Sequence, residues 1–337
     1  MKKYLLYILY LIILLELTSR TYLSVTHTVP FFQPGNMVYT FFPGLEEIKN
    51  TPMTAGDEYF DVLLLGGSVL HPDWGTVGIA LKQTLSENMR REVRIHNSAF
   101  QGHTSRDSYF KYNHLKDKPF DVVLFYHGIN EVRTNNCPPA VFKTDYSHYY
   151  HWYSLLKLAD EHQELKYITF PYTLRLGWLL LQEKLNKDNL MAPNKLKPEW
   201  LKYGGDIKSE KSFGENLRNI ADIAREKGEL LMLSTFAFYV PEDYSLRNFR
   251  RRVLDYGKHR SAVEIWGKPQ HVIAGIVAHN RQVHRIANRY PEIKFIDLNA
   301  KMPRNRQHFD DICHLTPEGA LFYSKEVTKA VLQSLKE

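Results

Sequence analysis

Cysteine is scarce in this sequence: the 337-residue chain contains two, Cys137 and Cys313. So few cysteines exclude a disulfide framework and a cysteine-based zinc site. The glycine pair at Gly66 and Gly67 fits neither G-x-x-x-x-G-K-[ST] nor G-x-G-x-x-G, so this position is neither a phosphate loop nor a dinucleotide loop. The chain also has no visible internal repeat or low-complexity tract. These absences leave an ordinary globular chain whose function must be sought in its motifs.

Charge and hydrophobicity set broad limits on what the chain does. Hydrophobic residues make up 44% of it and charged residues 24%, enough to bury a full core in one large or two modest domains. The 44 Lys and Arg against 37 Asp and Glu give a formal net charge of +7, which favours acidic partners only mildly. We expect no nucleic-acid partner, and the composition implies no metal and no organic cofactor.

The N-terminus combines Lys2 and Lys3 with a wholly apolar run from Tyr4 to Leu15. A run this short is typical of a signal peptide, but no small-residue cleavage site follows it, and its tyrosines suit a membrane interface. The sequence therefore favours an uncleaved signal anchor at residues 1–20, with a cleaved, secreted form and a buried core helix as alternatives. Because the lysines stay cytoplasmic, a single-pass anchor in the cytoplasmic membrane places the catalytic domain on the periplasmic or extracellular side.

Alternation of strands and helices begins after an extended connector, which we predict for residues 21–58 from their prolines. From residue 59 onward, short apolar runs alternate with helical patterns, as parallel strands with crossover helices do. This order predicts an α/β fold, a three-layer α/β/α sandwich with a mainly parallel five-stranded sheet. The expected strands are 60–65, 93–96, 120–128, 229–236 and 293–298, and the expected helices are 76–90, 105–115, 214–226, a long one ending near 289, and one capped by Thr316.

Polar residues follow several of these strands. In open parallel sheets, ligands bind in the crevice beyond the carboxyl ends of the strands. The first strand runs into Gly66, Gly67 and Ser68, and the second and third strands are followed by Gly102 and Asn130. Taken alone, Ser68 is read more simply as the N-cap of the next helix, and Asn130 as an ordinary turn residue. The rest of the chain has to decide between these interpretations.

The segment after the fifth strand, HFDDICHLTPEG, places Asp311 three residues before His314. Serine, glycine, asparagine and histidine in this order, each after a different strand, resemble the SGNH hydrolase superfamily, also called GDSL esterases and lipases. The resemblance covers about Phe60 to Leu335, and the D-x-x-H segment followed by L-T-P-E-G is its most specific part. It implies a flavodoxin-like SGNH fold and the activity of a serine hydrolase.

Ester cleavage accounts for these residue types. A serine hydroxyl such as that of Ser68 needs a base to remove its proton, and the imidazole of His314 titrates near neutral pH. A carboxylate on the other ring nitrogen keeps the imidazole in one tautomer. The D-x-x-H spacing selects Asp311 for this role, although the adjacent Asp310 is equally plausible by position alone. The predicted catalytic residues are thus Ser68, Asp311 and His314.

The resemblance also implies an oxyanion hole, formed by the backbone N–H groups of Ser68 and Gly102 and the side-chain amide of Asn130. The sequence departs from the family pattern in two places. Gly67 stands where the name-giving G-D-S motif has aspartate, and Glu131 follows the asparagine where aspartate is common. Neither change removes a predicted catalytic group, so we expect them to affect substrate range and rate more than catalysis itself.

A long insertion, about residues 134–213, separates the third and fourth strands. Its segment from Tyr146 to Leu158 is dense in aromatic residues, which suits either a lid or platform over the active site or the packing of the helix itself. Cys137 lies in this insertion, and Cys313 directly precedes His314. In an exported domain, a disulfide between the two cysteines would tie the insertion to the catalytic loop.

The sequence therefore predicts a membrane-anchored serine esterase of the SGNH type with its catalytic domain at residues 59–337. We expect it to hydrolyse acyl esters, acetyl first among them, of an envelope glycan or lipid through an acyl-enzyme on Ser68. Two alternatives stand beside this prediction. An O-acyltransferase would pass the same acyl group to a sugar hydroxyl, and a non-catalytic glycan-binding module would keep the fold but not the chemistry.

Overall fold

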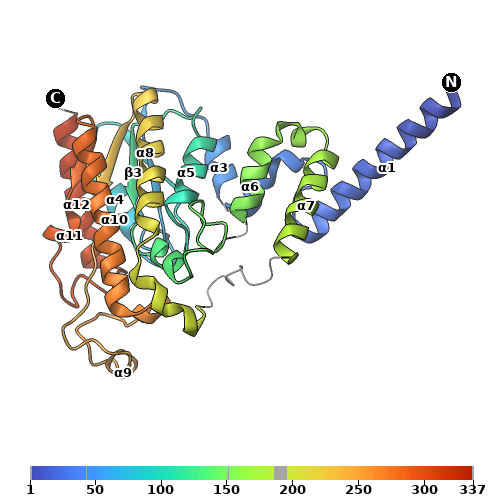
Figure 1. Ribbon diagram of the computed structural model, residues 1–337. Helices are drawn as coiled ribbons and strands as arrows, with labels where there is room; N and C mark the ends of the chain where they lie inside the picture. Colours follow the sequence, from blue (N-terminus) through green and yellow to red (C-terminus); the bar gives the residue numbers. More distant parts are fainter. Residues whose placement is uncertain (1, 43, 151, 186–195, 336–337) are drawn as a thin grey trace. The chain divides into compact units, whose positions relative to one another are not determined.

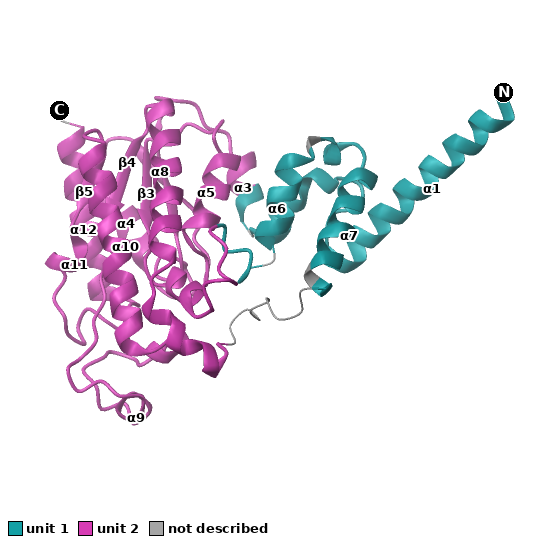
Figure 2. Cartoon of the chain, in the orientation of Figure 1, with its two compact units in different colours: residues 1–46, 145–193 teal, residues 47–144, 194–337 magenta. Residues whose placement is uncertain are grey.

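The computed structural model describes residues 2–42, 44–150, 152–185 and 196–335, and it divides the chain into two compact units (Figure 2). Unit 1 comprises residues 1–46 and 145–193, and unit 2 comprises residues 47–144 and 194–337. The middle part of the predicted insertion therefore folds together with the N-terminal residues. No local pattern indicates this pairing, because the two segments are about 100 residues apart in the chain.

Unit 2 is built around a five-stranded parallel sheet with the strand order β2-β1-β3-β4-β5 (Figure 1). Strand β1 is buried along nearly all of its length, as the continuous apolar run from Val62 to Leu65 predicts. The predicted α/β fold with a five-stranded sheet is confirmed. The strands are β1 (Tyr59–Gly66), β2 (Glu92–Asn97), β3 (Val122–Tyr126), β4 (Leu230–Ser234) and β5 (Lys294–Ile296).

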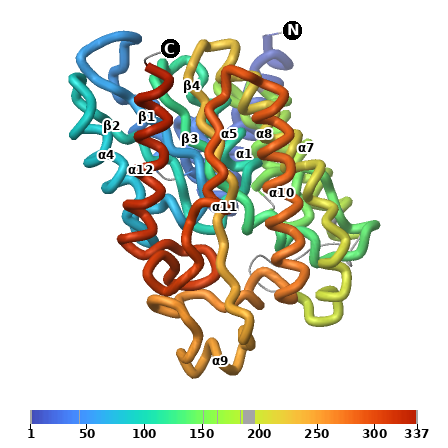
Figure 3. Tube along the Cα trace, turned by 90° about the vertical axis from the view of Figure 1, so that its left-hand side faces the viewer, coloured from blue at the N-terminus to red at the C-terminus, as the bar shows by residue number. Residues whose placement is uncertain are grey.

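Helices cover both faces of this sheet and complete three layers (Figures 1 and 3). Two long helices pack together on one face, and three on the other. They are α4 (Val77–Ser86) with α12 (Pro317–Ser334), and α5 (Ser105–His114), α8 (Ser209–Lys227) and α10 (Pro269–Arg289). As predicted, Thr316 caps α12: its hydroxyl accepts the backbone N–H of Gly319 at 3.1 Å.

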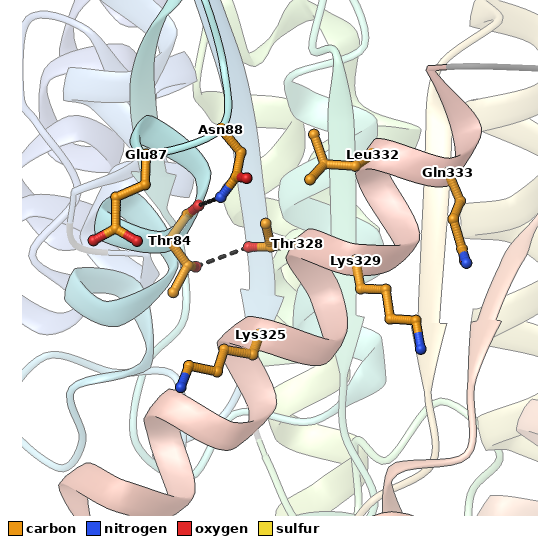
Figure 4. A pocket seen from close by; sticks show the side chains of 8 residues that line it. All are labelled: Thr84, Glu87, Asn88, Lys325, Thr328, Lys329, Leu332 and Gln333. Atoms are coloured by element: carbon orange, nitrogen blue, oxygen red, sulfur yellow. Dashed lines mark hydrogen bonds between the residues drawn. The ribbon is translucent and has the colours of Figure 1, made fainter.

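Helices α4 and α12 hold a groove of about 480 Å³ between them (Figure 4). The buried hydroxyls of Thr84 and Thr328 lie 2.8 Å apart and link the two helices. None of the predicted site residues lines this groove. The shorter helices of the chain outside the sheet layers are α3 (Leu45–Asn50), η2 (Asn130–Asn135), η4 (Pro198–Gly205), α9 (Leu246–Arg250), η5 (Val263–Ile265) and α11 (Leu298–Lys301).

The strand order creates a topological switch point. The chain leaves β1 for the edge strand β2 and then returns to the other side of β1 to form β3. The register pairs Gly66 at the end of β1 with Tyr126 at the end of β3. The loops that carry Ser68 and Asn130 therefore leave the sheet side by side, at the place where open α/β sheets bind their ligands.

Unit 1 is helical and has a small core of its own. Its helices are α1 (Lys2–His27), η1 (Pro34–Asn36), α2 (Met37–Phe41), α6 (Trp152–Glu161), η3 (Gln163–Lys166) and α7 (Phe170–Leu185). Leu23, Met37 and Tyr172 are buried together in the core. The structure differs here from the extended connector predicted for residues 21–58, because burial of Leu23 and Met37 stabilises helices on both sides of the prolines.

The aromatic segment at the start of α6 is packed rather than exposed. Tyr149, Tyr150 and Tyr153 are buried. The ring centroids of Tyr149 and Tyr150 lie 4.4 Å apart, and those of Tyr150 and Tyr153 lie 5.4 Å apart, in both cases edge to face. Such pairs add to the hydrophobic gain of burial. Of the two interpretations of this segment, its own packing is the one that these contacts favour.

Candidate active site

Ser68 lies in the turn that directly follows β1. The backbone N–H of His71 donates to the Ser68 carbonyl at 3.1 Å, so the chain reverses at once. Helix α4 begins only at Val77, with Thr76 at its N-cap position. Ser68 is therefore not the helix cap of the simpler interpretation. Its side chain is buried, at 7% exposed, and it is turned toward another part of unit 2.

The Ser68 side chain faces the loop that carries His314, a residue 246 positions later in the sequence. The Nε2 atom of His314 lies 2.9 Å from the Oγ atom of Ser68, and both side chains are buried. The loop is closed on itself: Phe309 and Leu315 form an antiparallel bridge, and the Asp310 backbone N–H donates to the His314 carbonyl at 2.8 Å. This closure limits the positions that the imidazole can take.

The carboxylate of Asp311 holds the other side of the imidazole. Its Oδ2 atom lies 2.8 Å from Nδ1 of His314 and also accepts the backbone N–H of Ser261 at 2.9 Å. Its Oδ1 atom accepts the backbone N–H groups of Cys313 and His314 at 3.0 and 2.9 Å. Because a carboxylate only accepts, Nδ1 carries the proton and Nε2 is left to accept the Ser68 hydroxyl. This is the tautomer that a general base requires.

Asp310 takes no part in this contact. Its carboxylate is buried and lies 3.2 Å from Nζ of Lys258 and 3.4 Å from Nε of Arg260. The structure thus separates the two aspartates that position alone left equivalent. Asp311 is the neighbour of the imidazole, and Asp310 is the neighbour of a basic loop.

The side-chain amide of Asn130 is fixed from two directions. Trp266 Nε1 donates to its Oδ1 at 3.2 Å, and its Nδ2 donates to the His103 carbonyl at 2.8 Å. An amide nitrogen has two hydrogens, so the second remains able to donate to a substrate. Gly102 precedes His103 in a turn and has φ at +78°, a conformation that favours glycine. The structure therefore brings the loops of Gly102 and Asn130 into contact.

Gly67 explains the departure from the G-D-S motif. A Cβ atom at this position would lie 2.8 Å from Nδ2 of Asn130 and 3.3 Å from the His103 carbonyl oxygen. Contacts this short force a neighbour to move, so an aspartate here would displace the amide. In this chain the residue before the serine has to be small because the asparagine packs directly against it.

A buried polar network joins α5 to the loops that follow β2 and β3. The Nζ atom of Lys111 lies 2.7 Å from Nδ1 of His103, and the carboxylate of Glu131 accepts the backbone N–H of Ser105. Burial lowers the pKa of Lys111 to about 7 and raises the pKa of Glu131 to about 7. Glu131, which directly follows Asn130, is thus a buried acid that supports the loop beside the site.

Trp74 is a site residue that the sequence analysis missed. Its ring stacks on that of His314, with centroids 4.7 Å apart and an angle of 27° between the planes. Its Nε1 atom donates to the side chain of Gln101 at 2.8 Å. The aromatic face of Trp74 thus covers one side of the imidazole ring. No motif marks Trp74 or Trp266, since both act through contacts with residues distant in the sequence.

The two cysteines are buried free thiols in the structure, so the disulfide predicted between Cys137 and Cys313 is not formed. The sulfur of Cys137 instead donates to the Thr134 carbonyl at 3.4 Å. Asp311, Cys313 and His314 offer metal-ligand atoms within 4.8 Å of one another. However, burial raises the pKa of the Cys313 thiol well above its usual range, and a metal ligand has to be a thiolate. Within this group, the Asp311 carboxylate is bonded to the imidazole of His314.

A small cavity adjoins Ser68. Its volume is about 10 Å³, roughly the space of one water molecule. The residues that line it come from the loops after β1 and β3 and from the end of β4: Gly67, Ser68, Val69, Tyr126, His127, Gly128, Ile129, Asn130 and Phe236. A group bound next to the Ser68 hydroxyl therefore has little room on this side.

No family model matches the chain, and no curated protein matches it. Several solved structures are similar to it. A GDSL-like lipase from Bacteroides thetaiotaomicron is 13% identical, with 86% of this chain and 95% of that one covered and a TM-score of 0.46. The lipase/acylhydrolase from Enterococcus faecalis is 15% identical (80% and 94% covered, TM-score 0.41). The acetylxylan esterase Axe2 from Geobacillus stearothermophilus is 14% identical (81% and 94% covered, TM-score 0.42). Similarity at this level carries no conclusion about what this chain acts on.

Glu131→Gln is expected to change how stability depends on pH. The pKa of Glu131 rises from 4.5 to about 7 on burial, so its contribution to the free energy of unfolding is full below about pH 4.5 and is lost as the pH rises to about 7. The loss amounts to about 3 kcal/mol. Denaturant unfolding of the full chain in detergent at pH 5 and pH 8 measures it.

The exposed Glu226→Gln is the matched control and should keep the parental pH dependence. Between the two pH values, Glu131→Gln should lose clearly less stability than the parent and the control. The same loss in all three proteins would show that Glu131 ionises normally in the folded chain.

Proposed function

We propose that the chain is a serine esterase of the SGNH type that hydrolyses acyl esters through an acyl-enzyme on Ser68. The observation that carries this proposal is the hydrogen-bonded series from Ser68 Oγ to His314 Nε2 and from His314 Nδ1 to Asp311 Oδ2, with distances of 2.9 and 2.8 Å. A nucleophile, a base and an orienting acid in this arrangement recur in serine hydrolases of unrelated folds. Its position at the switch point of a parallel sheet supports the same function.

In the first half of the reaction, His314 accepts the proton of Ser68 while Oγ attacks the carbonyl carbon of the ester. Asp311 stabilises the imidazolium that forms. The tetrahedral intermediate then breaks its bond to the alcohol, and the alcohol oxygen takes the proton from His314. In the second half, His314 deprotonates a water molecule, which attacks the acyl carbon. The bond to Ser68 Oγ then breaks, Oγ takes the proton back from His314, and the acid is released.

The negative charge that develops on the carbonyl oxygen needs donors already in place. We assign this role to the backbone N–H groups of Ser68 and Gly102 and to the second N–H of the Asn130 amide. The contacts of Asn130 with Trp266 and with the His103 carbonyl support the assignment, because they hold the amide in one orientation. Trp266 then acts as a positioning residue for the oxyanion hole.

A short acyl group is the one that the site favours. The cavity of about 10 Å³ beside Ser68 leaves no space for a long chain on that side, so acetyl is the acyl group we propose. The alcohol part belongs to a glycan or lipid of the cell envelope. This assignment follows from the proposed location of the protein, outside the cytoplasmic membrane.

Helix α1 supports that location. Within the described residues it is the one helix long and apolar enough to cross a membrane, with a mean hydropathy of 1.5 over its most apolar stretch. Its residues from Tyr4 to Leu15 are exposed, whereas Ser19 and Leu23 are buried. The exposed part matches the apolar run that the sequence predicts as an anchor. We propose a single-pass anchor with unit 2 on the periplasmic or extracellular side.

Contacts at the end of the apolar run favour an uncleaved signal anchor over a cleaved signal peptide. The Glu16 carboxylate accepts the backbone N–H groups of Thr169 and Phe170 at 2.8 and 3.2 Å, where α7 begins. The carboxylate also pairs with Arg20, whose guanidinium donates to the Phe31 carbonyl at 2.8 Å. Cleavage near residue 20 would leave the first N–H groups of α7 without these acceptors.

Ser68→Ala and His314→Ala should each lower kcat for 4-nitrophenyl acetate by about 1,000-fold or more, because each removes a member of the acyl-transfer machinery. The assay uses the full chain in detergent, and acetate should react faster than butyrate. A parent no faster than the two variants would rule out ester hydrolysis. Acylated sugar formed in place of free acid, when a glycan acceptor is added, would identify an O-acyltransferase instead.

Gly67→Ala tests the oxyanion hole. Its Cβ atom would push against Nδ2 of Asn130, so kcat should fall about 10- to 100-fold with little change in KM. Gly78→Ala is the control, since a Cβ atom there meets its nearest neighbour, Asn97 Nδ2, at an ordinary 3.5 Å. Parental kcat in both alanine variants would remove Asn130 from the proposed site.

The proposed anchor is tested by the intact mass of the protein extracted from membranes. The full chain has a mass of 39.5 kDa, and we expect to recover that mass from a carbonate-washed membrane fraction. A soluble protein lacking about 20 N-terminal residues would instead identify a cleaved signal peptide.

A further inference from the structure

A polar cavity of about 500 Å³ borders the loop that carries Asp310 and Asp311. Four of its eight lining residues are basic, and no acidic residue lines it in the described part of unit 2. The lining consists of Arg252, Val253, Leu254, Tyr256, Gly257, Lys258, His259 and Arg306. Figures 1 and 3 show α9 and the chain that follows it at the same end of unit 2 as the segment that leads into α12.

The positive charge in this cavity is only partly compensated. Lys258 shares the buried carboxylate of Asp310 with Arg260. Arg252 and Arg306 form no ion pair within the described residues, and both are exposed. Burial lowers the pKa of His259, the charges of Arg252 and Arg306 lower it further, and the charge of Asp311 raises it. The cavity therefore has an excess of positive charge that a bound anion would balance.

The loop around this cavity is held in a fixed and costly conformation. The backbone N–H groups of Gly257 and His259 donate to the carbonyls of Phe309 and Asp310 at 2.8 and 2.7 Å. Arg252 and His259 have φ at +57° and +60°, a region that costs energy for residues other than glycine. Surface loops that carry charge for solubility alone do not need such strain. The two residues lie in one tightly turned segment.

The same loop reaches the candidate active site. The backbone N–H of Ser261 donates to the Asp311 carboxylate at 2.9 Å. The guanidinium of Arg260 donates to the Trp74 carbonyl at 2.7 Å, and the Trp74 ring stacks on His314. Through Arg260 and Ser261, the loop that borders the cavity therefore contacts two residues of the candidate site, Trp74 and Asp311.

We propose that this cavity is a subsite for an anionic group on the alcohol part of the ester, so that the substrate class is an acylated acidic glycan. A carboxylate or phosphate on a sugar near the acylated hydroxyl would pair with Arg252 and Arg306. A neutral glycan carries no charge to pair with the two guanidinium groups, and an acyl chain would require an apolar lining. The volume lies in the range of small-ligand sites. The inference rests on the esterase function proposed above.

The kinetic test compares two acetylated substrates, an oligogalacturonate and a neutral xylo-oligosaccharide, with the full chain in detergent. The double variant Arg252→Gln/Arg306→Gln should lower the ratio of kcat/KM for the acidic over the neutral substrate at least about tenfold, because charge-assisted hydrogen bonds are lost. Arg247→Gln/Arg250→Gln removes the same charge from α9, outside the cavity, and should keep the parental ratio. An unchanged ratio in the first double variant would overturn the proposal.

A binding test separates the subsite from the catalytic proposal. In the Ser68→Ala background, calorimetry should show acetylated oligogalacturonate binding at least about tenfold more weakly when Arg252 and Arg306 are also replaced by glutamine. If the parent proves inactive on 4-nitrophenyl acetate but this difference persists, the esterase function fails and the subsite stands. Equal binding overturns the subsite. Loss of binding to phosphatidylglycerol vesicles alone, with oligogalacturonate binding unchanged, overturns the glycan assignment.

Discussion

The buried carboxylate of Asp311 is the interaction on which the rest of the site depends. It accepts the imidazole N–H of His314 and the backbone N–H groups of Cys313, His314 and Ser261. The bond to the imidazole orients His314, and the bonds from the Cys313 and His314 backbone N–H groups fold the loop that carries it. The bond from Ser261 fixes the neighbouring basic loop. A buried acceptor with this many donors cannot be replaced by a neutral side chain without leaving several N–H groups unsatisfied. Geometry and electrostatics are thus determined together by one side chain.

A second constraint is steric and lies at the switch point of the sheet. Parallel strands β1 and β3 end side by side, so the loops that follow them, which carry Gly67 and Asn130, pack closely against each other. The close approach of Asn130 leaves room for no side chain at position 67. This accounts for a glycine where the G-D-S motif has aspartate. The altered motif is therefore a compensated feature of this site, and it does not weaken the case for an active enzyme.

Unit 1 combines two physical roles in one helix. The first half of α1 exposes a continuous apolar surface, and its second half contributes Leu23 to a small core and, through Glu16, acceptors for the start of α7. Removing this helix would therefore take away a core side chain and the acceptors at the start of α7. The residues around α6 and α7 are therefore best understood as the support of the proposed anchor.

The sequence alone determined the parts that depend on local pattern. Continuous apolar runs such as Val62 to Leu65 marked the strands, Thr316 and Pro317 marked the last helix, and the D-x-x-H spacing marked Asp311 and His314. These features need no knowledge of distant contacts, because burial of a strand and capping of a helix are decided by neighbouring residues.

Only the tertiary structure decided what depends on residues far apart in the chain. It placed Trp74 on His314, turned Asp310 toward the basic loop, left Cys137 and Cys313 as separate thiols, and made helices from part of the predicted connector. None of these leaves a local signal, since each depends on contacts between segments that are far apart in the chain. The basic cavity is the clearest case, because Arg252 and Arg306 are far apart in the sequence and line one space only in the folded chain.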